Sequence, residues 1–259
     1  MTQESIDVLL VEDEQKHIED ATTYFGQSPG ARVNLTVSRT LVEAENRLEE
    51  REFDGIVSDV FFPEGERTDE ATREPWERLI ERNYDVTSPI AGLLIRRIPF
   101  VSRLCYAVLR QSIESPYTSP SRRGYALDWV YRRREPPTGL LLAEYAIANN
   151  IPLVLCTDTH GHSDATQFIS DYRDHMEERR NEHVSVIGTE VYDTSGRIDY
   201  NAKALTKEWG KAHKWLVFSV AMKQCGVSLT EYDDSRKEQP KVRERFEQLA
   251  GVPFGSLFD

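Results

Sequence analysis

The first sixty residues alternate short apolar runs with amphipathic stretches, and this alternation limits the possible folds more than any other feature of the chain. Runs of β-branched and aliphatic residues at 6–11, 32–37 and 54–60 have the length and composition of strands. Residues 12–27 and 40–53, which lie between them, carry apolar side chains at helical spacing. Strands and helices in this order form right-handed βαβ units, so the sequence predicts a parallel sheet.

The same rhythm returns in the second half of the chain. Residues 138–150 form an amphipathic stretch, and apolar strands are predicted at 151–157 and 183–188. A long amphipathic segment at 202–226 is predicted to be one helix, and a shorter helix is predicted at 241–252. The expected fold is therefore α/β, a doubly wound five-stranded parallel sheet with a mainly helical insertion and a C-terminal helical extension.

These patterns divide the chain into four segments. Residues 1–63 and 138–190 carry the two parts of the sheet, and 64–137 interrupt them as an inserted, arginine-rich helical module. Residues 191–259 are expected to hold a hairpin, the last helix of the sheet domain and the extension.

Composition narrows the class of protein. The chain has 259 residues, 39% of them hydrophobic and 29% charged, and its net charge is -12, which opposes general nucleic-acid binding. Its three cysteines are widely separated, which favours a reducing compartment over a disulfide framework. It contains no apolar run of the roughly 20 residues that a membrane span needs, and its first residues lack the basic region of a secretory signal. We expect a cytoplasmic protein, and its oligomeric state stays open.

Acidic and hydroxyl side chains follow three of the predicted strands. Glu12 and Asp13 follow the first strand, Asp59 ends the third, and Thr157 ends the fourth. The carboxyl ends of parallel strands share one edge of the sheet, so three carboxylates are expected to meet there and to require a cation. Oxygen ligands of this kind suit Mg2+. The alternative is that such acids only cap the following helices, as Asp13 could.

Three stretches, "DVLLVEDE", "FDGIVSDVFFP" and "IPLVLCT", resemble the receiver domain of two-component response regulators. The resemblance covers residues 5–63 and 138–188 and implies a flavodoxin-like receiver fold. It implies that Asp59 is the phosphoacceptor and that Thr157 is the switch hydroxyl. It also implies that Mg2+ is held by Glu12, Asp13, Asp59 and the backbone carbonyl of Phe61.

The resemblance further implies a signalling protein whose partners are a sensor kinase, a downstream effector protein or both. Its enzymatic activity would not go beyond phosphorylation and dephosphorylation of its own aspartate. Three features depart from the family's pattern: the insertion, Asp158 in place of a small residue after Thr157, and the absence of a lysine in "VSVIGTEV". Lys203 is the candidate for the missing phosphate contact. The alternative is a phosphorylation-independent pseudo-receiver that acts as a binding scaffold.

A second motif points to a different class of protein. "HGHSD" presents His160, His162 and Asp164, a spacing that resembles the first zinc motif of metallo-β-lactamase-fold hydrolases. The sequence therefore also allows a metal-dependent hydrolase. The alternative, which we favour because short motifs often mislead, is that these are polar loop residues that cap the next helix.

The insertion is basic although the chain is acidic. Nine arginines lie between Pro89 and Glu135, against three acidic residues. Arginines mixed with aromatic side chains can bind an acidic protein partner or nucleic acid, and the net charge favours the protein partner. They can also form a solvated face that pairs with acids of the same chain. The candidate partner-binding residues are Arg122, Arg123, Trp129, Arg132, Arg133 and Arg134.

Overall fold

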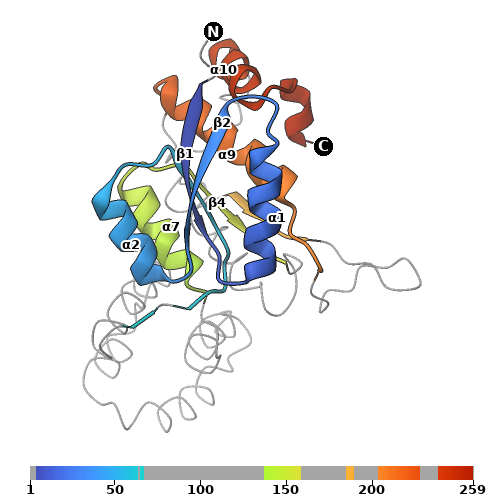
Figure 1. The fold of residues 1–259 in the computed structure, drawn as a ribbon. Helices are drawn as coiled ribbons and strands as arrows, with labels where there is room; N and C mark the ends of the chain where they lie inside the picture. Colours follow the sequence, from blue (N-terminus) through green and yellow to red (C-terminus); the bar gives the residue numbers. More distant parts are fainter. Residues whose placement is uncertain are drawn as a thin grey trace, which may run out of the picture.

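A computed structural model describes residues 4–63, 65–66, 137–158, 185–189, 204–227 and 239–258. Five parallel strands form one sheet in the order β2-β1-β3-β4-β5 (Figure 1). The predicted flavodoxin-like α/β fold is thereby confirmed. The strands are β1 (Ser5–Val11), β2 (Arg32–Ser38), β3 (Gly55–Ser58), β4 (Leu153–Cys156) and β5 (Ser185–Ile187).

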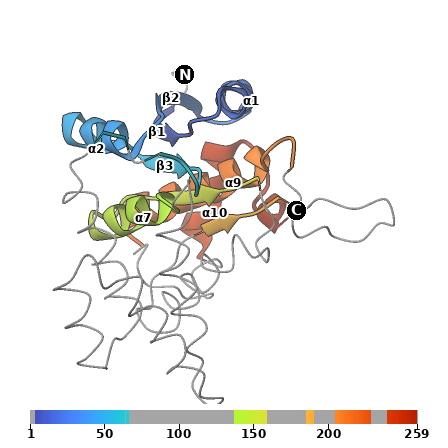
Figure 2. The ribbon, with the colours of Figure 1, turned by 90° about the horizontal axis from the view of Figure 1, so that it is seen from below.

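Helices cover both faces of the sheet, as a doubly wound fold requires. α1 and α9 lie on one face, and α2 and α7 lie on the other (Figures 1 and 2). The helices are α1 (Gln15–Gly26), α2 (Leu41–Glu50), α7 (Gly139–Ala148), α9 (Trp209–Gln224) and α10 (Pro240–Ala250), followed by the 3-10 helix η3 (Phe254–Phe258).

Strand β1 is apolar over residues 8–11, and both of its faces are buried there. Val8 and Leu10 pack into the core beneath α1 and α9. Leu9 and Val11 face the opposite way and pack into the core beneath α2 and α7. Successive side chains of a strand point to opposite faces, so a continuous apolar run is the pattern of a strand covered on both sides.

The C-terminal extension belongs to the same core. α10 lies at the end of the sheet where β1 begins (Figure 1), and the Leu249 carbonyl accepts a hydrogen bond from the Ala31 amide at 2.7 Å. Phe246 of α10 packs against Phe218 of α9 with ring centroids 6.4 Å apart, and against Phe254 of η3 at 5.6 Å. The extension therefore closes the end of the molecule opposite the carboxyl ends of the strands.

The prediction of one helix over 202–226 is wrong at its N-terminal end. α9 begins at Trp209, and the described residues before it, 204–208, are not helical. The amide of Ala204 donates instead to the carbonyl of Asp158 at 2.8 Å, just beyond β4. This hydrogen bond holds residues 204–208 beside the carboxyl end of β4. A helix that continued through these residues could not make this contact.

Two further predictions, the helical insertion and the lack of a membrane span, concern parts of the chain that the structure describes only in part. Almost all of the predicted insertion, 64–137, lies outside them, so its helical character stays a prediction. In the part of the chain that the structure describes, none of the helices is long and apolar enough to span a bilayer.

A buried histidine in the α1–α9 interface makes stability depend on pH. His213 is 4% exposed and packs edge-on against Phe25, and burial lowers the pKa of its imidazole from 6.5 to about 4. Because the folded state disfavours the protonated ring, its contribution is full above pH 6.5 and is lost as the pH falls towards 4. We expect His213 to reduce the free energy of unfolding by about 3 kcal/mol between pH 7 and pH 4, at about 1.4 kcal/mol per pKa unit.

The measurement is denaturant unfolding of wild type and His213→Gln across that pH range. Other groups titrate in both proteins, so the informative quantity is the difference between the two curves. The difference in the free energy of unfolding between wild type and His213→Gln should become smaller as the pH falls. Parallel curves would contradict the assignment.

Candidate functional site

Two acids meet where β1 and β3 end. In the register of these parallel strands Val11 lies opposite Ser58, so the residues that follow them, Glu12 and Asp59, are brought together. The backbone holds them there, because the Asp59 amide donates to the Val11 carbonyl at 2.8 Å. One carboxylate oxygen from each of Glu12, Asp13 and Asp59 lies within 4.8 Å of the others. The structure thus brings together the three acids that the sequence singled out.

A lysine that the sequence analysis did not select joins these acids. The ammonium nitrogen Nζ of Lys207 lies 2.5 Å from Oε2 of Glu12 and 3.0 Å from Oδ1 of Asp59. Its side chain is 1% exposed, and the Glu12 side chain is fully buried, whereas 11% of the Asp59 side chain is exposed. Asp59 is therefore the more accessible carboxylate of the two that bind Lys207.

Lys207 reaches the acids because it precedes α9 instead of lying within it. Its Nζ also lies 5.9 Å from the centre of the Trp209 ring, at the first residue of the helix. The neighbouring Leu205 carbonyl accepts a hydrogen bond from Lys16 of α1 at 2.7 Å, which ties the segment to the opposite side of the site. The lysine predicted for this role, Lys203, lies outside the described residues.

Burial dominates the electrostatics of the site. It raises the pKa of Glu12 to about 7, with a further increase from the charge of Asp59 that Lys207 partly offsets. Burial likewise raises the pKa of Asp59 against the opposing effect of Lys207. Burial acts to lower the pKa of Lys207, but attraction to Asp59 and Glu12 outweighs it and raises that pKa. Lys207 is therefore a permanent cation, and the fully ionised cluster of three acids and one lysine has an excess of negative charge.

That excess and the donor atoms fit a hard divalent cation such as Mg2+. The set consists of oxygens only, and Asp13 is partly exposed, as Mg2+ with bound water requires. Glu12 already accepts hydrogen bonds at both oxygens, from Lys207 and from the Glu14 amide at 3.2 Å. Phe61 lies two residues beyond Asp59 with a partly buried side chain, and its role as a carbonyl ligand stays a prediction.

The alternative reading of Asp13 as a helix cap has no support here. α1 begins at Gln15, and its N-cap residue is Glu14, whose side chain makes no capping hydrogen bond.

Thr157 lies at the next strand end. It follows β4 and is buried, its amide donates to the Ile187 carbonyl at 2.9 Å, and its carbonyl accepts from the Thr189 hydroxyl at 3.0 Å. These backbone hydrogen bonds hold it at the predicted edge of the sheet. Its role as a switch hydroxyl is untested by the geometry.

The start of α7 packs directly against the backbone of Asp59. A Cβ atom on Gly139 would lie 2.4 Å from the Asp59 carbonyl oxygen, and the Gly139 amide donates to the Val60 carbonyl at 3.0 Å. Only glycine permits this approach. Because α7 follows the long insertion, the chain returns from the insertion to the edge of the acidic site.

The other predicted site residues lie outside the described residues. These are the histidine motif and the arginine-rich candidates, namely His160, His162, Asp164, Arg122, Arg123, Trp129, Arg132, Arg133 and Arg134. Comparison of the chain with models of protein families, with curated proteins and with solved structures gave no match.

Proposed function

We propose that this chain is an atypical receiver-like signalling protein that is phosphorylated on Asp59 with Mg2+ and acts through protein contacts. The observation that carries the proposal is the Lys207 ammonium at 3.0 Å from Asp59, beside two further acids at the carboxyl edge of a β2-β1-β3-β4-β5 sheet. The resemblance of the sequence motifs to receiver domains supports the same function. The partners in this proposal are a sensor kinase, a downstream effector protein or both.

The proposed chemistry is transfer of a phosphoryl group to a carboxylate. Among the described residues, both hydrogen-bond donors to Asp59, Lys207 and the Val60 amide, contact Oδ1, so we assign the nucleophile to Oδ2. Oδ2 forms the bond to phosphorus while the bond from phosphorus to the donor's leaving group breaks, and that group departs with the electron pair. Lys207 offsets negative charge on the phosphoryl oxygens. Mg2+ bound by the acids would supply further neutralisation of that charge.

The same contacts offer a route from the site to the rest of the fold. A phosphoryl group on Asp59 would compete with Glu12 for the Lys207 ammonium. Lys207 belongs to the segment 204–208, which leads into α9 and is tied to Asp158. We infer that phosphorylation shifts the position of this segment and thereby changes the surface that a partner binds.

The second candidate function is a phosphorylation-independent binding scaffold. It is favoured by the distance of 2.5 Å from Lys207 to Glu12, because the ammonium already compensates the acid that would otherwise hold metal. In a scaffold the cluster would serve stability alone.

Phosphorylation is tested by incubating the full chain with Mg2+ and acetyl phosphate, followed by intact-mass analysis. Wild type should gain the mass of one phosphoryl group, whereas Asp59→Asn should gain none. Asp54→Asn is the matched control, because Asp54 flanks the opposite end of β3 and should not affect labelling. Unlabelled wild type under conditions that label an established receiver would exclude phosphotransfer, and an unchanged melting temperature with Mg2+ would then favour the scaffold.

A further inference from the structure

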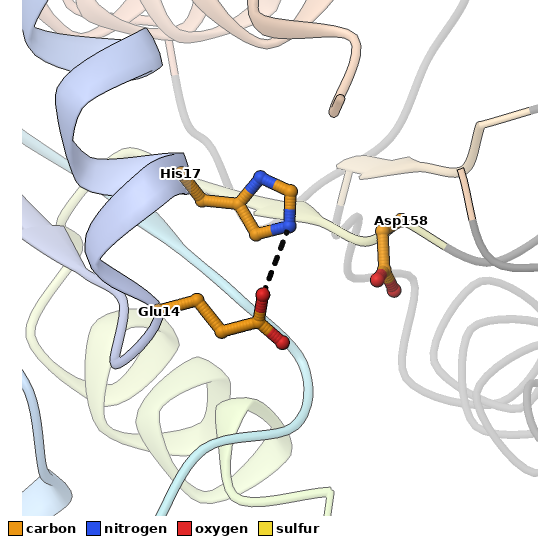
Figure 3. A group of neighbouring side chains, drawn as sticks. All are labelled: Glu14, His17 and Asp158. Carbon is orange, nitrogen blue, oxygen red and sulfur yellow. Dashed lines mark ion pairs between the residues drawn. The ribbon is translucent and has the colours of Figure 1, made fainter. Parts of the chain in front are cut away.

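A second group of potential metal ligands lies beside the acidic cluster and has no part in the proposed phosphotransfer. It consists of Glu14 and His17, at the start of α1, and Asp158, just beyond β4. Figure 3 shows the imidazole of His17 directed towards the Glu14 carboxylate, with Asp158 on the side of the imidazole away from α1. One ligand atom from each residue lies within 4.8 Å of the other two.

The distance between His17 and Glu14 fits two ligands of one metal ion. Nε2 of His17 lies 3.5 Å from Oε2 of Glu14, which is longer than an ordinary N–H···O hydrogen bond. Two atoms that ligate one tetrahedral ion through bonds of about 2.1 Å are separated by roughly 3.4 Å. The pair is therefore too distant for good mutual hydrogen bonding and well spaced for a shared cation.

The burial of His17 supplies an independent indication of a ligand. The residue is 3% exposed, and its Nδ1 has no hydrogen-bond partner among the described residues. Burial, together with the nearby charge of Lys207, lowers the pKa of His17 and so favours the neutral ring, the form that binds metal. Among the described contacts Nε2 has only the 3.5 Å approach to Glu14, so a cation bound at Nε2 would replace a poor hydrogen bond with a stronger interaction.

We propose that Glu14, His17 and Asp158 bind a divalent transition-metal ion, with water completing the coordination. The imidazole distinguishes this site from the oxygen-only cluster of Glu12, Asp13 and Asp59. Imidazole nitrogen suits ions such as Zn2+, whereas Mg2+ selects oxygen ligands. The chain would thus hold two neighbouring cation sites, one that prefers transition-metal ions and one that prefers Mg2+.

The second site would also change the charge around Asp59. Asp158 adds to the negative potential at Asp59, and it occupies the position directly after Thr157. A cation bound by Asp158 would offset that charge and make the neighbouring edge of the sheet more favourable for an anion. The metal site itself does not require that Asp59 be phosphorylated.

The test is a titration of the metal-free full chain with Co2+, followed by displacement with Zn2+. We expect a visible absorption spectrum typical of nitrogen and oxygen ligation, saturation at one equivalent attributable to this site, and no displacement by excess Mg2+. Glu14→Gln, Asp158→Asn and His17→Gln should each weaken binding by roughly tenfold or more. Glu14 is exposed, so its variant tests the site even if the substitution of buried His17 disturbs folding.

Two control variants separate this site from the others. Asp59→Asn alters the oxygen-only cluster and should weaken Co2+ binding much less than the ligand substitutions do, because Asp59 acts on this site only through its charge. His160→Gln alters the histidine motif and should leave Co2+ binding unchanged. Absence of Co2+ binding by wild type, or binding that is lost in His160→Gln but retained in Glu14→Gln and Asp158→Asn, would overturn the proposal.

Discussion

Replacing Lys207 with methionine is expected to lower the free energy of unfolding at pH 7 by about 3–5 kcal/mol. The side chain is 1% exposed and its ammonium contacts Glu12 and Asp59, so the substitution leaves two buried carboxylates without their counter-ion. For a protein of this size the melting temperature should fall by roughly 6–20 °C. The loss should shrink as the pH falls towards 5, because protonated carboxyl groups need no counter-ion.

Two comparisons identify the cause of this loss. Lys211→Met removes an exposed lysine from the same helix and should change stability by less than about 0.5 kcal/mol. Adding Glu12→Gln and Asp59→Asn to Lys207→Met should restore much of the lost stability, since the neutral side chains no longer repel each other. A Lys207→Met protein as stable as wild type would contradict the buried ion-pair cluster.

Replacing Gly30 with alanine is expected to cost about 3 kcal/mol or more, the upper end of the range for overpacking. The added Cβ would lie 2.0 Å from the Leu249 carbonyl oxygen and 2.6 Å from the Gly251 amide nitrogen. Backbone atoms cannot rotate out of the way as a side chain can, so the end of α10 must move. That movement breaks the hydrogen bond from Ala31 to Leu249 and exposes part of the aromatic core around Phe246.

Hydrogen exchange measured along the chain distinguishes this local effect from general instability. In Gly30→Ala the amides of α10 should exchange faster than in wild type, with a smaller change in α7. Gly26→Ala is the matched control, because no heavy atom lies within 4 Å of its added Cβ. It should be neutral or slightly stabilising, as expected for alanine at the end of a helix. Normal protection of α10 in Gly30→Ala would contradict the close packing of the extension.

The fold was predictable because the strands and their covering helices carry local patterns. β1 and β3 are apolar on both faces, which identifies strands buried beneath two layers of helices. The boundary of α9 was not predictable in the same way. Residues 202–226 continue one amphipathic pattern, and only the tertiary hydrogen bond from Ala204 to Asp158 shows where the helix cannot extend.

The acids of the site were predictable from the sequence, and the lysine that binds them was not. Glu12, Asp13 and Asp59 each follow a recognisable strand, so topology alone places them at one edge of the sheet. Lys207 follows no strand directly and was assigned to a helix. The sequence places Lys207 two residues before Trp209, the first residue of α9. That position alone gives only a weak indication that the lysine belongs to the site.

The origin of Lys207 late in the chain also determines when the site is completed during protein synthesis. Lys207 lies 195 residues after Glu12, so at 5–20 residues per second a ribosome needs roughly 10–40 s to join the two. From the synthesis of Asp59 until that of Lys207, the nascent β1–β3 unit has these two acids without the ammonium that lies between them in the finished protein. Its β3 edge also stays unpaired until β4 has been made. Translation of the segment 204–208, just before α9, therefore supplies the positive charge at the centre of the protein, and a chain released before that segment lacks this charge.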